Sequence, residues 1–176
     1  FLRIQNGIMD APVFRYAEVL LINAEANAEL GLCTQTVIDN TINVLRARAG
    51  VQKMDIASLQ KDADSDFPDV PVLIDEIRRE RRVELAVEGF RYDDMMRWKA
   101  GRLFTKPVLG MKFVQYQYPK IVVGKDLYVN ADGFILPYAV SLPDGRTFDE
   151  DKDYLFPLPL DELQLNTNLT QNPGWE

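Results

Sequence analysis

Apolar and charged residues share a helical spacing over residues 72–98, the most informative pattern in the chain. Pro71 suits the first turn of a helix, and Gly89 is placed to end one. At about 100° per residue, four apolar residues fall on one arc: Leu73, Ile74, Ile77 and Leu85. Four charged residues fall on the same arc: Glu80, Arg81, Glu84 and Glu88. The pattern therefore predicts a helix whose inner side carries charge.

Charge on an apolar arc needs partners, because an ordinary surface helix keeps its charged residues on the opposite side. We expect those partners just past Gly89, among Arg91, Asp93, Asp94 and Arg97. The sequence thus predicts a helix pair held by a partly buried ion-pair clasp, made of Glu80, Arg81, Glu84, Glu88, Arg91 and Arg97. Buried ion pairs fix geometry more than they add stability, so we favour a structural role over a catalytic one.

Two shorter helical patterns precede this one, and residues 1–11 are predicted to be a connector. The first pattern covers residues 12–30 and is followed by Gly31, which suits the position after a last helical turn. The second has apolar residues at helical spacing and stops at Gly50: Ile38, Ile42, Leu45 and Ala49. The short loop between the two patterns predicts an antiparallel helix hairpin.

Helical spacing is lost in residues 102–153, where turn signals and aromatic residues increase. Apolar residues on both sides of residues 130–133 predict a β-hairpin with a three-residue loop. Sugar-binding sites combine exposed aromatic faces with a few polar groups. We therefore expect ligand-binding residues among the tyrosines of this region: Tyr116, Tyr118, Tyr128 and Tyr138. The alternative is that these rings pack a local β unit.

Several motifs of the chain resemble one known family. They lie in residues 15–26, 43–50 and 77–98, and in the closing Gln171-Asn172-Pro173-Gly174-Trp175, where Trp175 is predicted to anchor the tail. Together they resemble the SusD/RagB family, outer-membrane lipoproteins of Bacteroidetes that capture nutrients. Members of that family are much longer, so the sequence resembles their C-terminal portion.

The resemblance implies a mainly α fold with tetratricopeptide-like helix hairpins and a small insertion that contains a β-hairpin. We expect a single domain over residues 1–176, with a helical core at 12–100, the insertion at 102–153 and a closing segment at 154–176. The implied function is non-catalytic: such a protein captures oligosaccharide and passes it to a SusC-like TonB-dependent transporter. The implied location is the outer face of the outer membrane, and no cofactor is expected.

Composition narrows the function further. The chain has 176 residues, no histidine, one cysteine and a net charge of −7. The absence of histidine excludes Ser-His-Asp and Cys-His catalysis and histidine metal sites. The acidic charge argues against nucleic acid and anionic membrane surfaces. The spacing of Asp62, Asp64 and Asp66 opens a calcium loop, but the turn glycine and final glutamate are missing, so no metal is expected.

One alternative function and one question about the chain's start stay open. A helical-repeat adaptor for protein–protein interaction would share the predicted hairpin, but it would not explain the closing Asn-Pro-Gly-Trp residues. The sequence begins at Phe1 with no initiator methionine or export signal, so we expect a processed or truncated chain. The resemblance places membrane attachment on an N-terminal lipid anchor, which would precede this sequence.

Overall fold

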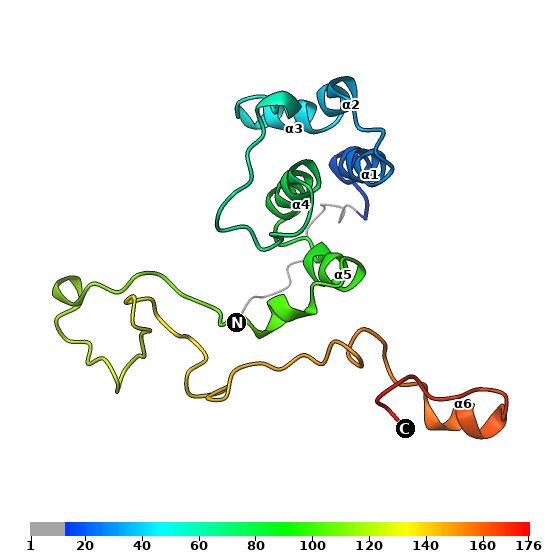
Figure 1. The fold of residues 1–176 in the computed structure, drawn as a ribbon. Helices are drawn as coiled ribbons and strands as arrows, with labels where there is room; N and C mark the ends of the chain where they lie inside the picture. The colour runs from blue at the N-terminus through cyan, green and yellow to red at the C-terminus, as the bar shows by residue number, and fades with distance from the viewer. Residues whose placement is uncertain (1–12) are drawn as a thin grey trace, which may run out of the picture. The chain divides into compact units, whose positions relative to one another are not determined.

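The computed structural model describes residues 13–176 (Figure 1). The connector predicted at residues 1–11 lies outside the described residues. The chain divides into two compact units, Phe1–Arg91 and Tyr92–Glu176, and each is described by itself below. The single domain predicted over residues 1–176 stays a prediction. None of the described helices is long and apolar enough to cross a membrane.

Unit 1 contains the predicted helix hairpin and the charged helix that follows it. The helices are α1 (Tyr16–Glu29), α2 (Gln35–Asn40), α3 (Ile42–Ala49) and α4 (Val72–Glu84), with a short 3₁₀ helix, η1 (Ile56–Ser58), before α4. The predicted second helix is divided at Thr41, whose hydroxyl donates to the Val37 carbonyl at 2.6 Å. Thr34 caps α2, and α3 ends at Gly50 with φ 69°.

The core of unit 1 joins these helices through one apolar cluster. Its fully buried members come from α1, α2, α3 and α4: Leu21, Ala24, Ile38, Ile42 and Ile77. Burying a leucine or isoleucine side chain contributes about 1.5–3 kcal/mol relative to leaving it exposed. Because α1 and α4 contribute to the same cluster, residues far apart in the sequence lie side by side (Figure 1).

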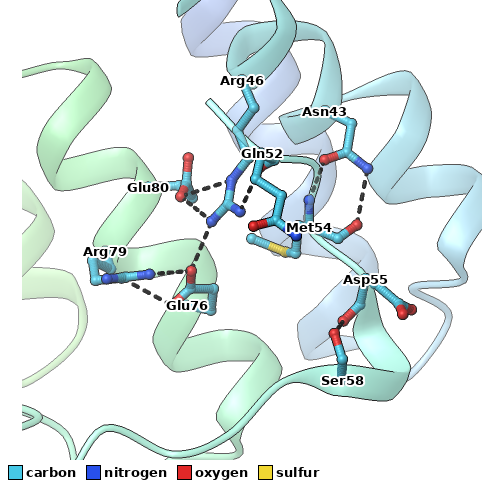
Figure 2. Close-up of polar contacts among 9 residues, drawn as sticks. All are labelled: Asn43, Arg46, Gln52, Met54, Asp55, Ser58, Glu76, Arg79 and Glu80. Atoms are coloured by element: carbon cyan, nitrogen blue, oxygen red, sulfur yellow. Dashed lines mark hydrogen bonds and ion pairs between the residues drawn. The ribbon is translucent and has the colours of Figure 1, made fainter. Parts of the chain in front are cut away.

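The connection after α3 is held by amide side chains (Figure 2). Asn43 donates to the Met54 carbonyl at 3.0 Å and accepts from the Met54 N–H at 2.6 Å. Gln35 repeats this arrangement by donating to the Met54 carbonyl and accepting from the Ile56 N–H, both at 2.9 Å. The side chains of Asn43 and Gln35 thus supply the hydrogen bonds that backbone groups of Met54 and Ile56 would otherwise make in a helix or sheet. The irregular segment between α3 and α4 is held in this way.

The helix predicted to reach Gly89 ends earlier. α4 stops at Glu84, and Val87 has a positive φ of 68° before Gly89 at 90°. The next helix, α5 (Phe90–Arg97), begins directly after Gly89. Glu88 therefore lies in the turn between the two helices.

Unit 2 has little regular structure after α5. It contains two 3₁₀ helices, η2 (Gly101–Thr105) and η3 (Gln115–Gln117), and one short helix, α6 (Leu160–Leu165). Phe148 stacks on Phe104 with ring centroids 5.3 Å apart and meets the edge of Tyr154 at 4.9 Å. A side chain on Gly101 would collide with the Phe148 ring, so this position requires glycine.

The prediction of a β-hairpin in the insertion is wrong, because no strand forms among residues 13–176. The turn is present: the backbone N–H of Asn130 donates to the Phe134 carbonyl at 2.9 Å, and Val129 and Ile135 form an isolated antiparallel bridge. On the edge of residues 133–137 that faces away from this turn, the backbone N–H of Ile135 donates to the Met111 carbonyl at 3.1 Å. The next donor on that edge would come from residue 137, a proline with no N–H, so the ladder stops there.

Candidate functional site

The charged side of α4 lies against arginines from α3. Arg46 Nη2 is 2.7 Å from Glu76 Oε1 and 2.5 Å from Glu80 Oε1 (Figure 2). Its Nη1 also donates to the Gln52 carbonyl at 3.1 Å. The Arg46 side chain is 12% exposed. This one guanidinium therefore links α3, the following connection and two turns of α4.

Arg15 and Arg48 extend the same network toward the end of α4. Glu84 Oε1 lies 2.5 Å from Arg15 Nη1 and 2.7 Å from Arg48 Nη2. Arg15 Nε also donates to Glu88 at 2.7 Å. The hydrogen bonds that Arg15 donates lower the pKa of the Glu88 carboxyl, and accepting carboxylates at Glu88 and Glu84 raise the pKa of Arg15. A lowered pKa is the opposite of what a general acid requires.

Of the remaining members of the predicted clasp, Arg81 lies on α4, and Arg91 and Arg97 lie on α5. Arg81 is buried, with its guanidinium 5.5 Å from the centre of the Phe90 ring. Arg97 pairs with Asp94 at 2.9 Å and lies over the Trp98 ring. Arg91 lines a small hollow of about 150 Å³ beside α4.

Sequence reasoning therefore missed the arginines that hold the glutamates: Arg15, Arg46 and Arg48. Arg46 and Arg48 stand in the last turn of α3, where basic residues also complement the helix dipole. That position was readable from the sequence. Their pairing with glutamates 30 to 36 residues away was not.

The four candidate tyrosines all lie in unit 2 with their side chains accessible. Tyr116 is 80% exposed, and the others are 39–52% exposed: Tyr118, Tyr128 and Tyr138. Tyr118 also stacks on Phe113, with centroids 5.8 Å apart, which fixes its ring. These rings are thus available for stacking against a ligand.

Tyr138 lies in the wall of a hollow of about 230 Å³. The other lining residues are mostly apolar: Pro107, Val108, Leu136, Ala139, Leu142, Pro143, Gly145 and Arg146. Successive turns shape it, since Leu142 donates to the Tyr138 carbonyl at 2.8 Å and Gly145 to the Leu142 carbonyl at 3.1 Å. Arg146 donates to the Lys106 carbonyl, which ties the two sides together. The other three candidate tyrosines are not among the residues that line this hollow.

The closing motif binds the extended segment before α6. Gln171 accepts from the Leu158 N–H at 2.7 Å and donates to the Leu158 carbonyl at 3.0 Å. Asn172 donates to the Phe156 carbonyl at 2.6 Å, and the Trp175 indole donates to the Leu155 carbonyl at 3.0 Å. Each polar side chain of the motif thus satisfies a backbone group of residues 155–158.

Comparison with known proteins agrees with the family resemblance of the sequence motifs. The sequence profile of the SusD family matches residues 2–175. The chain belongs to the SusD family. SusD-like protein P2 of Formosa agariphila is 31% identical over 166 residues, which cover 92% of this chain and 25% of that protein. SusD-like protein P38 of the same organism is 34% identical over 100 residues, covering 56% of this chain and 19% of the relative.

A solved structure supports the SusD fold. The chain superposes on a SusD-like protein from Bacteroides fragilis with a TM-score of 0.58 and 27% identity. The match covers 92% of this chain and 25% of the other. The chain therefore spans about a quarter of the length of P2 and of this structure. The mainly helical, tetratricopeptide-like prediction is confirmed for unit 1.

Proposed function

We propose that this SusD-family chain is a non-catalytic, glycan-binding part of a nutrient-uptake system at the outer membrane. The single observation that carries the proposal is the accessibility of its tyrosine rings in unit 2: Tyr116, Tyr118, Tyr128 and Tyr138. An exposed ring offers a flat apolar face, and its hydroxyl offers a hydrogen bond at the edge. That combination suits a sugar, which has an apolar C–H face and hydroxyl groups around its rim.

The proposal has three further parts. The chain passes its ligand to a SusC-like TonB-dependent transporter, it is attached by an N-terminal lipid anchor, and it lies on the outer face of the membrane. Membership of the family supports these steps. The mechanism is capture and release without bond breaking. Pairing of the α4 carboxylates with arginines supports a structural role for the charged helix.

Oligosaccharide binding by the full chain tests the proposal. A variant with the four tyrosines changed to alanine should bind at least about tenfold more weakly, since each ring contributes stacking energy. Tyr16→Ala, an equally exposed tyrosine on α1 of unit 1, is the matched control and should leave the affinity unchanged. Binding is measured by glycan array and titration calorimetry. Equal affinity of wild type and quadruple variant would contradict the proposal.

A helical-repeat adaptor is the second candidate, and one observation favours it. α1 exposes apolar side chains on the side away from the core, including Tyr16, Val19 and Leu30 next to its end. Exposed apolar surface of this kind is typical of an interaction face. The two candidates separate in the same experiment, because the adaptor predicts no oligosaccharide affinity and no effect of the unit 2 tyrosines.

A further inference from the structure

We propose that the hollow around Tyr138 and Arg146 selects an anionic sugar, one that carries a carboxylate or a sulfate group. This inference rests on the proposed glycan-binding function and adds the ligand class. It depends on two features of the same hollow, an apolar wall and a cation without a carboxylate partner.

The wall suits one face of a sugar ring. Most of its residues are apolar, and the Tyr138 ring, which is 52% exposed, forms part of it. Its backbone donors at Ala139, Leu142 and Gly145 are already bonded to carbonyls within the turns. A ligand in the hollow therefore meets few polar partners, so its C–H face can pack inward while its hydroxyl groups stay in water.

Arg146 supplies the charge. Its guanidinium donates to the Lys106 carbonyl, and no carboxylate of residues 13–176 forms an ion pair with it. Arg15, Arg46 and Arg48 of unit 1 are each paired with glutamate. A guanidinium has five N–H donors, so Arg146 keeps donors for a bidentate bond to a carboxylate or sulfate.

The negative charge of the chain repels anions, so the affinity for an anionic sugar depends on its direct contact with Arg146. The chain carries a net charge of −7, and the exposed Asp144 stands two residues before Arg146 on the same turn. Long-range attraction is therefore weak, and affinity depends on the short-range bond. Removing the carboxylate in Asp144→Asn should strengthen binding of an anionic sugar, and more so at low salt.

The test compares matched ligands on the full chain by titration calorimetry. The probes are galacturonate oligomers, the same oligomers after carboxyl reduction, and sulfated galactose oligomers. We expect at least one anionic oligomer to bind about tenfold or more tightly than the neutral one. Arg146→Gln should lower the affinity for the anionic oligomer to that of the neutral oligomer measured on the same variant, and Arg146→Lys should restore part of the difference. Lys125→Gln, an exposed lysine of unit 2, is the control and should change nothing.

Each outcome separates this inference from the proposed function. Equal binding of neutral and anionic oligomers overturns the anion selectivity and leaves glycan binding in place. A preference that survives in Arg146→Gln overturns the assignment to this hollow. Failure of all neutral and anionic oligomers to bind overturns the proposed function and this inference with it. Circular dichroism of Arg146→Gln and Arg146→Lys verifies that both variants keep the wild-type structure.

Discussion

The α4 network of unit 1 and the Tyr138 hollow of unit 2 use arginine in different ways. In unit 1, arginines pair with the glutamates around α4 and hold helices together, and the buried apolar side chains form one core. In unit 2, Arg146 has no carboxylate partner among the described residues, and the four candidate tyrosines are exposed. The same residue types therefore serve structure where partners are supplied by neighbouring helices, and remain available for a ligand where irregular segments carry them.

The largest expected effect comes from removing a structural arginine. Arg46→Ala would leave the mostly buried Glu80 without its ion-pair partner, while Glu76 would keep only the exposed Arg79. We expect a loss of about 2–4 kcal/mol in the free energy of unfolding, below the full cost of breaking a completely buried pair. Urea unfolding followed by circular dichroism measures it. Lys125→Ala, at an exposed lysine of unit 2, is the control and should change stability by less than about 0.5 kcal/mol. Similar losses in both variants would break the comparison.

A smaller effect is expected from the closing motif, whose side chains are hydrogen-bonded to the backbone of residues 155–158. Gln171→Ala removes two hydrogen bonds to the Leu158 backbone. The local opening free energy at Leu158 should fall by about 1 kcal/mol, since a typical hydrogen bond contributes that much. Hydrogen exchange of the Leu158 amide reports it. Gln117→Ala, on the exposed η3, should leave that amide unchanged. Unaltered exchange in Gln171→Ala would show that the bonds do not hold this segment.

The smallest expected effect is a pH dependence in unit 1. Arg15 lowers the pKa of Glu88 in the folded chain, so the unfolded chain takes up a proton at higher pH. The stabilisation is therefore present above the pKa of Glu88 in the unfolded chain, and it is lost as pH falls through the lower pKa of the folded chain. Melting temperatures across this range should fall less steeply in Glu88→Gln than in wild type. Parallel curves for the two proteins would exclude this contribution.

Much of unit 1 is readable from the sequence because its signals are local. Helical spacing and the glycines at 31 and 50 predicted α1 and the end of α3. The division at Thr41 was missed, because a side-chain bond to a carbonyl one turn back leaves no mark on the apolar pattern.

The parts that sequence reasoning missed depend on contacts between distant segments. The glutamates of the predicted clasp were identified as charges needing partners, but their partners come from α3 and from the residue before α1. In unit 2 the candidate tyrosines are accessible, whereas Arg146 gave no signal of its own. Its position becomes meaningful only when the turns at 136–145 bring it beside Tyr138.

The bonds from Arg15 to Glu84 and Glu88 also bear on how unit 1 folds. They span 69 and 73 residues of sequence, whereas α2 and α3 are neighbours in the chain. Closing a long loop costs entropy before its contacts repay it, so distant pairings form late and slow the reaction. α1 can pack against α2 and α3 early in folding. Its remaining apolar surface is buried, and Arg15 finds its carboxylate partners, only when α4 has docked. We infer that docking of α4 is the step that commits unit 1 to its native state.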